Sequence, residues 1–181
     1  MSPRLVLVGP PGAGKTTVGR IVAAELALGF RDTDEDVAAV AGTPIADVFF
    51  EHGEAHFRVL EQAAVVRALA EHDGVLALGG GAVLDTRSRT ALAGCPVVFL
   101  DVGLVDAVRR VGLARDRPVL LGNPRGQLKQ LLDARRPVYA AVAAATVDTS
   151  DRTPEDIAAE VVRLVRDGQV TEAPDPREPS W

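Results

Sequence analysis

A glycine-rich stretch near the start of the chain constrains the fold more than any other feature. Residues 9–17, Gly-Pro-Pro-Gly-Ala-Gly-Lys-Thr-Thr, match the phosphate-binding pattern G-x-x-x-x-G-K-[ST], and the apolar residues 5–8 directly precede them. This order predicts a buried strand, a turn whose backbone N–H groups face phosphate oxygens, and a helix whose positive dipole end points at the same anion. We therefore expect the loop to hold a nucleoside triphosphate, with Lys15 on the outer phosphates and Thr16 on Mg²⁺.

Apolar runs alternate with helical patterns along the rest of the chain. The runs at residues 75–78 and 97–101 lack polar alternation, which is typical of strands buried on both faces of a parallel sheet. Helical spacing extends from the loop to about Leu28, and a later helix from Leu128 is expected to be interrupted near Pro137. Five strands alternating with helices predict an α/β fold with a doubly wound, mostly parallel sheet and ligands at the carboxyl edge of its strands.

Length and composition narrow the organisation and the partners. A chain of 181 residues suits one domain, which we place at residues 1–167, with a lid at about 112–124 where apolar periodicity is lost; the Pro- and charge-rich tail 168–181 is expected to be disordered. A net charge of −5 gives no footprint for nucleic acid. The single cysteine and the absence of a basic leader or long apolar segment predict a cytoplasmic protein without a membrane partner, and nothing signals an interface, so we expect a monomer.

Acidic residues at strand ends are the candidates for magnesium binding and acceptor orientation. Asp32 and Asp34 lie two apart at the end of a short strand, so both can reach the crevice beside the phosphate loop, although a solvated acidic turn that caps the next helix explains them equally well. Asp101 ends another buried strand and is the usual position for the magnesium acid. The strand before it ends instead in three glycines, 79–81, which imply close approach of a ligand or of another backbone segment.

Arginines gather near the predicted strand ends. Most surface arginines are solvated, but a group of them beside a phosphate loop in an acidic chain indicates a small anionic ligand, because a guanidinium binds carboxylate or phosphate bidentately. The candidates are Arg58, Arg110, Arg115, Arg117, Arg135, Arg136 and Arg152.

The ordered set of motifs resembles the shikimate kinase family up to about residue 166. After the phosphate loop come D-T-D at 32–34, F-R-x-x-E at 57–61, G-G-G at 79–81, R-P at 117–118 and R-x-P-x-Y at 135–139. The resemblance implies a P-loop NTPase-like three-layer fold of the nucleoside-monophosphate-kinase type with a five-stranded sheet. It also implies transfer of the γ-phosphate of ATP to the 3-hydroxyl of shikimate, with Mg²⁺ as cofactor and shikimate and ATP as the small-molecule partners.

The resemblance also implies a role for individual residues. Asp34, Lys15 and Arg117 would be catalytic. Thr16 would hold the metal directly and Asp32 through water, so Asp101 would no longer be the magnesium acid. The implied ATP-binding residues are Gly12, Ala13, Gly14, Lys15, Thr16, Thr17, Arg110, Arg117 and Arg152. The implied substrate-binding residues are Asp34, Arg58, Gly80, Gly81 and Arg135, with Glu61 orienting Arg58 and with Ile45, Phe49 and Phe57 as walls for the ring.

Two other functions and one other register remain as alternatives. A gluconate or nucleoside-monophosphate kinase of the same fold would share the donor loop but need a different acceptor pocket. A binding module that has lost catalysis would be expected to have lost Lys15, Thr16, Asp34 or Arg117 first. Arg136, next to Arg135, takes over the carboxylate role if the register of the last motif is shifted by one residue.

Overall fold

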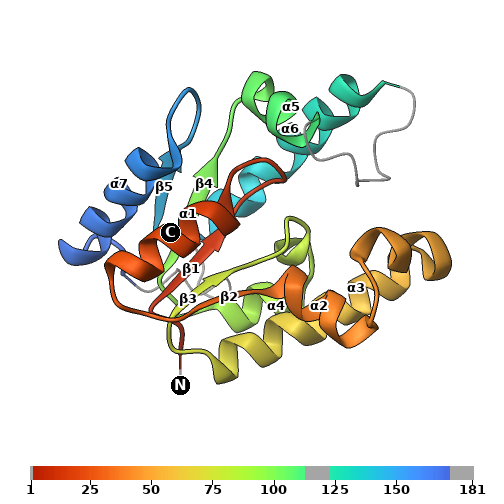
Figure 1. Ribbon diagram of the computed structural model, residues 1–181, viewed down its shortest axis with the longest axis horizontal. Coiled ribbons are helices and arrows are strands. Elements are labelled where there is room, and N and C mark those ends of the chain that lie inside the picture. The colour runs from red at the N-terminus through yellow and green to blue at the C-terminus, as the bar shows by residue number, and fades with distance from the viewer. Residues whose placement is uncertain (1, 113–122, 172–181) are drawn as a thin grey trace, which may run out of the picture.

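Five strands form one sheet with helices on both of its faces in a computed structural model, which describes residues 2–112 and 123–171 (Figure 1). The strands are β1 (Leu5–Val8), β2 (Phe30–Asp32), β3 (Val75–Ala77), β4 (Val97–Asp101) and β5 (Ala145–Asp148). The helices are α1 (Lys15–Glu25), α2 (Thr33–Ala41), α3 (Ile45–Glu71), the short 3₁₀ helix η1 (Ala82–Leu84), α4 (Thr86–Leu92), α5 (Leu104–Gly112), α6 (Pro124–Val142) and α7 (Pro154–Arg166).

The strand order β2-β3-β1-β4-β5 places the phosphate loop at the centre of the sheet. All four strand pairs are parallel, with Val6 of β1 opposite Leu76 of β3 and Val97 of β4. The predicted α/β fold with five strands is therefore confirmed, and the sheet is wholly rather than mostly parallel in the residues that the structure describes. Because parallel strands end at one edge, the segments that follow β1, β2 and β3 meet there.

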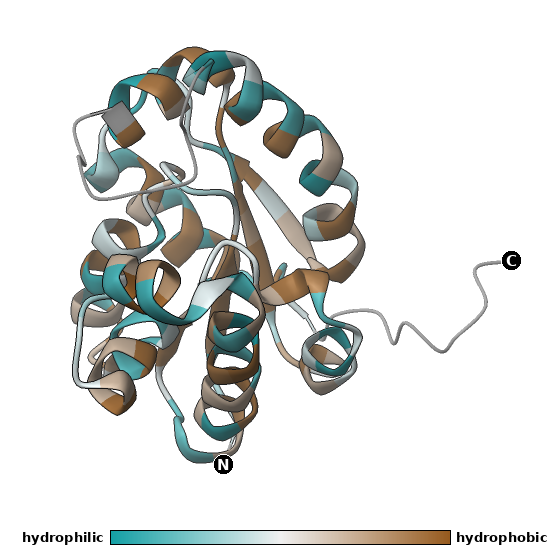
Figure 2. Cartoon of the chain, turned by 90° about the vertical axis from the view of Figure 1, so that its right-hand side faces the viewer, coloured by the Kyte–Doolittle hydropathy of each residue, from teal (hydrophilic) through white to brown (hydrophobic). Residues whose placement is uncertain are grey.

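Alternate residues of β1 supply the two halves of the core. Leu5 and Leu7 pack with residues of α1 and α7 on one face, and Val6 and Val8 pack with residues of α3, α4 and the end of α6 on the other. All four side chains are fully buried, as a strand covered on both faces requires. Figure 2 shows the hydrophobic residues concentrated on the central strands, with helices of mixed character around them.

The helix α3 bends at Gly53. Gly53 has φ 80° and ψ 172°, which divides α3 into residues 45–52 and 54–71. The rings of Phe49 and Phe57 face each other across the bend with centroids 4.4 Å apart, and they belong to a small apolar cluster between α2 and α3. This cluster is separate from the two main halves of the core and involves α2, the helix that directly follows Asp32.

Two helix boundaries differ from the sequence prediction. The predicted interruption near Pro137 is wrong, because α6 continues through it to Val142. A proline inside a helix costs about 3 kcal/mol, and burial of Leu128, Leu132, Tyr139 and Val142 against both halves of the core opposes that cost. The first helix ends at Glu25 rather than Leu28, because Ala27 takes a left-handed conformation (φ 54°) and the N–H of Leu28 donates to the carbonyl of Ala23.

Part of the predicted organisation falls on residues that the structure does not describe. The lid at 112–124 and the tail at 168–181 lie largely outside the described residues, and they stay predictions, as does the extent of the domain. In the described ranges, none of the helices combines the length and the apolar character needed to cross a lipid bilayer.

Candidate active site

The loop between β1 and α1 has the backbone that its glycines predict. Gly9, Gly12 and Gly14 all have positive φ (153°, 82° and 89°), a conformation that other residues rarely adopt. A Cβ on Gly9 would lie 2.5 Å from the carbonyl oxygen of Leu100, so the loop passes directly over the end of β4. The ammonium group of Lys15 donates to the carbonyls of Gly9 (2.8 Å) and Pro10 (3.1 Å). The positive charge is thus held at the concave side of the loop.

Asp32 joins the phosphate loop to the first turn of α2. The hydroxyl of Thr16 donates to Oδ2 of Asp32 (2.6 Å), and Oδ1 of Asp32 accepts from the backbone N–H of Asp34 (2.9 Å), which caps α2. Asp32 is only 7% exposed. Of the two interpretations of this motif, the cap is therefore correct but the solvated turn is wrong, because the same carboxylate is buried against the phosphate loop.

The three glycines after β3 are explained by side chains that approach them from three elements. A Cβ at Gly79 would meet the carboxylates of Asp34 and Glu61, and one at Gly81 would collide with the guanidinium of Arg58. A Cβ at Gly80 would lie 3.0 Å from the ring of Pro11 in the phosphate loop. The expected close approach is thus made in part by side chains, and it brings the phosphate loop, α2 and α3 around one turn.

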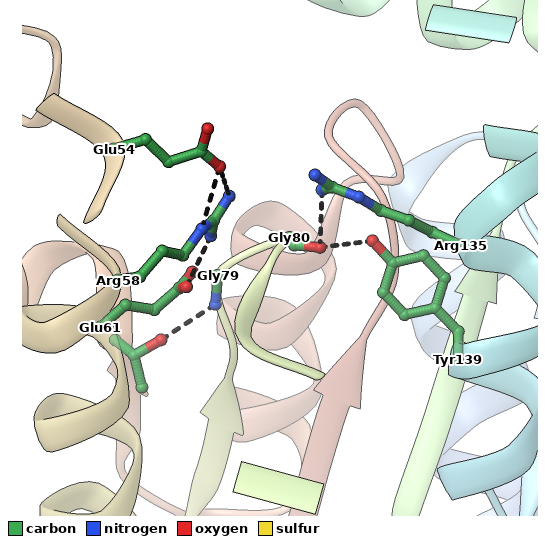
Figure 3. A network of polar contacts seen from close by, with 8 residues as sticks. Glu54, Arg58, Glu61, Gly79, Gly80, Arg135 and Tyr139 are labelled. Carbon is green, nitrogen blue, oxygen red and sulfur yellow. Dashed lines mark hydrogen bonds and ion pairs between the residues drawn. The ribbon is translucent and has the colours of Figure 1, made fainter. Parts of the chain in front are cut away.

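Arg58 lies between two carboxylates on α3 (Figure 3). Its Nη1 donates to Oε2 of Glu61 (2.6 Å), whereas Nε (3.3 Å) and Nη2 (3.1 Å) both donate to Oε1 of Glu54. Burial opposes the charged form of Arg58, but the two carboxylates outweigh it and raise the pKa of the guanidinium. Burial also raises the pKa of Glu61, and the attraction of Arg58 offsets this only in part. The guanidinium is therefore firmly cationic and oriented toward the glycine turn.

Arg135 approaches the same turn from α6. Its Nη1 donates to the carbonyl of Gly80 (3.2 Å), and this carbonyl also accepts a short hydrogen bond from the hydroxyl of Tyr139 (Figure 3). Arg136 lies elsewhere, because its Nε donates to both carboxylate oxygens of Asp101 (3.0 and 3.1 Å). Of the two adjacent arginines, the one expected in R-x-P-x-Y is thus the one beside the glycine turn, and Asp101 is engaged in a separate ion pair.

We expect Tyr139→Phe to remove a fall in the free energy of unfolding that the wild-type protein shows above pH 10. Burial raises the pKa of Tyr139 to about 12, from an ordinary 10.0. The folded protein keeps this proton where the unfolded chain loses it, so the contribution is complete below pH 10 and declines as the pH rises toward 12. At pH 11 the free energy of unfolding should have fallen by about 1.4 kcal/mol, the equivalent of one pKa unit.

The phenylalanine variant separates this titration from ring packing, because its ring can still stack on Phe99, whose centroid is 5.2 Å from that of Tyr139. Urea unfolding of both proteins at pH 9 and pH 11 measures the effect. The wild-type protein should lose about 1.4 kcal/mol more than Tyr139→Phe over this interval; parallel losses would show that Tyr139 does not retain its proton.

The arginines expected at the nucleotide base lie near the end of β5, on the side of the phosphate loop away from β3 and its glycine turn. Arg110 donates to the carbonyls of Gly12 (3.1 Å) and Thr149 (2.8 Å), which ties α5 to the loop after β5. Arg152 pairs with Glu160 (2.6 Å) and donates to the carbonyl of Asp148. Arg117 and Arg115 lie outside the described residues.

One cavity brings many of the predicted residues together. It is lined by Pro11, Gly12, Gly14, Lys15, Thr16, Thr17, Asp32, Asp34, Leu78, Gly80, Arg110 and Val111. Ala13, within the loop itself, is fully buried and does not line the cavity. Arg58, Arg135 and Arg152 are not among the lining residues; the first two adjoin the cavity through the glycine turn. The cavity therefore connects the phosphate loop with the place where two arginines converge.

Sequence reasoning assigned no role to three residues that shape the site. Thr33, fully buried between the two aspartates, accepts a hydrogen bond from the N–H of Gly79 (2.9 Å) and so fixes the glycine turn against α2. Glu54 shares Arg58 with Glu61, and Thr149 binds Arg110. For Glu54, the four-residue spacing to Arg58 on one helix was an available signal.

Comparison with known proteins gives the family. A model described as shikimate kinase matches residues 11–166, most of the chain. The chain belongs to the shikimate kinase family. The shikimate kinase of Salinispora arenicola is 61% identical over 165 residues, which cover 91% of this chain and 99% of that protein. The shikimate kinase of Streptomyces coelicolor is 53% identical over 156 residues, covering 86% and 91%.

Solved structures agree with this membership of the shikimate kinase family. Shikimate kinase from Acinetobacter baumannii in complex with shikimate superimposes with a TM-score of 0.86 at 32% identity, covering 94% of this chain and 96% of that one. Deoxyadenosine kinase from M. mycoides, at 13% identity and a TM-score of 0.63, shares the fold alone. The predicted P-loop fold of the nucleoside-monophosphate-kinase type is thereby confirmed.

Proposed function

We propose that the crevice between the phosphate loop and the glycine turn is where this chain, an ATP-dependent kinase of the shikimate kinase family, transfers the γ-phosphate of ATP to the 3-hydroxyl of shikimate. One observation carries the proposal. Arg58 and Arg135 reach the same three-glycine turn from different helices, and Gly80 in this turn packs directly on the phosphate loop. Paired guanidinium groups are the preferred receptor for a carboxylate, and these two lie beside the phosphate loop.

The surroundings of the two arginines favour a ring-shaped acceptor. Phe49 and Phe57, with Ile45, belong to the apolar cluster between α2 and α3, and Phe57 continues directly into Arg58. An apolar wall suits the carbon ring of shikimate better than the open hydroxylated chain of gluconate. A nucleoside monophosphate would offer a phosphate where this arrangement suits a planar carboxylate. Together with the family membership, these features support shikimate over both alternatives.

Asp34 is the group that orients the attacking hydroxyl and accepts its proton. Its carboxylate adjoins Gly79 and lines the cavity together with Lys15. The hydrogen bond from its backbone N–H to Asp32 fixes it in the first turn of α2, so it is presented to both the acceptor and the donor. Lys15 offsets charge on the phosphoryl group that moves. Arg117, outside the described residues, keeps the same role as a proposal from the family resemblance.

The oxygen donors at the phosphate loop fit Mg²⁺. Thr16 and the buried Asp32 both line the cavity, and their side-chain oxygens are 2.6 Å apart. A hydroxyl and a single carboxylate are hard oxygen ligands of the kind that hold Mg²⁺ beside phosphates, with water completing the shell. Mg²⁺ supplies neutralisation of the phosphate charge when it is bound. Thr16 would hold the ion directly and Asp32 through water.

The remaining partners follow from the same activity. Arg110 and Arg152 are proposed to border the adenine, since both flank the loop after β5 on the far side of the phosphate loop. The use of ATP supports a cytoplasmic location, and we propose that the chain acts as a monomer. Sedimentation equilibrium at micromolar concentration tests the last point, and a dimer mass would contradict it.

Release of ADP from the purified protein tests the proposed function. Shikimate, gluconate and AMP are offered in turn with ATP and Mg²⁺, and we expect release with shikimate alone. Identification of the product as the 3-phosphate by NMR fixes the acceptor hydroxyl. Release that depends on gluconate or AMP but not on shikimate would overturn the assignment.

A further inference from the structure

Every edge of the Arg58 guanidinium carries at least one carboxylate contact. A guanidinium binds a carboxylate bidentately through one of two edges, Nε with Nη2 or Nη1 with Nη2. Oε1 of Glu54 accepts from Nε and Nη2 and so occupies the first edge, whereas Glu61 takes Nη1 on the second. A substrate carboxylate therefore competes with Glu54 for the first edge and with Glu61 for Nη1 on the second.

The two acids differ in how easily they can leave. The side chain of Glu61 is 4% exposed, beneath Arg58 and next to Gly79, and its release would leave a buried carboxylate without a cation. The side chain of Glu54 is 67% exposed, on the open side of Arg58 (Figure 3). Glu54 is thus the acid that an incoming carboxylate displaces.

The position of Glu54 on α3 stabilises the displaced state. Glu54 directly follows Gly53, whose non-helical backbone begins a new helical segment at that point. A carboxylate in the first turn of a helix is favoured by the unpaired N–H groups and the positive end of the dipole. Rotation of its side chain into water therefore leaves Glu54 in a favourable place, and no movement of the helix is needed.

We propose that Glu54 is a competing counter-ion for Arg58 that the substrate carboxylate displaces, and that it thereby sets the affinity and the selectivity of the acceptor site. The inference rests on the proposed function, in which Arg58 receives the carboxylate of shikimate. The carboxylate of the substrate compensates Arg58 for the loss of Glu54, because it carries the same charge and can bind the guanidinium with both of its oxygens. A ligand without a carboxylate leaves Arg58 paired with Glu54 and gains nothing from it.

The test is Glu54→Gln, which removes the charge but preserves the shape. Because exposed ion pairs are weak, the Kd for shikimate, measured by calorimetry without ATP, should fall only about two- to fivefold at low ionic strength, and the KM should fall in parallel. Added salt should shrink the difference, since it screens the Glu54–Arg58 pair in the wild-type protein. Methyl shikimate, in which the carboxylate is an ester, should be bound equally by both proteins.

Glu51→Gln is the matched control. Glu51 carries the same charge on the same helix, three residues away, but it lies beside His52 (3.8 Å) rather than Arg58. This variant should leave the Kd for shikimate unchanged. An unchanged or higher Kd in Glu54→Gln would overturn the proposal, because Glu54 would then be an aid to Arg58 or to the substrate. An equal fall of the Kd in both variants would also overturn it, because the effect would then come from the net charge of the protein rather than from the Glu54–Arg58 pair. Failure of the wild-type protein to phosphorylate shikimate would instead refute the proposed function.

Discussion

Replacing Asp34 by asparagine should lower kcat by about 10²- to 10⁴-fold, the usual contribution of a positioned acid or base, and should change the affinity for ATP far less. The amide keeps the size of the side chain but cannot accept the proton of the attacking hydroxyl. The backbone of residue 34 stays in place, because its N–H is held by the carboxylate of Asp32. Steady-state kinetics with both substrates varied, together with calorimetry of ATP binding, separates the two effects.

Asp36→Asn provides the matched control for this change. Asp36 lies two residues further along α2, and its carboxylate pairs with Nε of Arg31 (2.7 Å) rather than facing the cavity. The same loss of one charge from the same helix should leave kcat near the wild-type value. Near-normal turnover in Asp34→Asn, or an equal loss in Asp36→Asn, would remove Asp34 from its proposed role.

Local chemistry explains why much of the fold could be predicted from the sequence. Apolar runs without alternation identify strands buried on both faces, and the glycine spacing of residues 9–17 requires a backbone that only glycine adopts easily. These signals lie within a few residues of one another. Pro137 shows the limit of such reasoning, because its local penalty is opposed by burial of α6 against elements distant in the sequence.

The site was less predictable where it depends on contacts between distant segments. The sequence does not show why residues 79–81 are all glycine. The reason is that Asp34, Arg58 and Pro11, on three other segments, leave no room for a side chain there. Thr33 gives no pattern of its own, because a threonine between two acids becomes meaningful only when the N–H of Gly79 reaches its hydroxyl.

The choice between Arg135 and Arg136 has the same origin. Adjacent residues on a helix point about 100° apart, so only one of the two can face the glycine turn. The sequence without the family motif leaves both open. The orientation of α6, set by burial of Tyr139 and Val142, directs Arg135 toward Gly80 and Arg136 toward Asp101.

Arg135→Ala should lower kcat/KM for shikimate, because it weakens binding of the transition state by about 2–5 kcal/mol, the cost of removing one partner of a buried charge pair. This corresponds to a loss of roughly 30- to 4,000-fold. The reason is that Arg135 stands opposite Arg58 across the glycine turn, so its removal leaves a substrate carboxylate with one arginine. Initial rates at subsaturating shikimate and saturating ATP measure the change, and the KM for ATP should move much less.

Arg136→Ala tests whether the loss of kcat/KM comes from the place of Arg135 beside the glycine turn or from the loss of any positive charge on α6. The variant removes the same charge one residue away, but its guanidinium serves Asp101, so kcat/KM should stay close to the wild-type value. A large loss in Arg136→Ala with none in Arg135→Ala would shift the motif by one residue. Methyl shikimate sharpens the comparison: without a carboxylate, wild-type and Arg135→Ala proteins should turn over this ester with similar kcat/KM, because the interaction that distinguishes them is then missing from both.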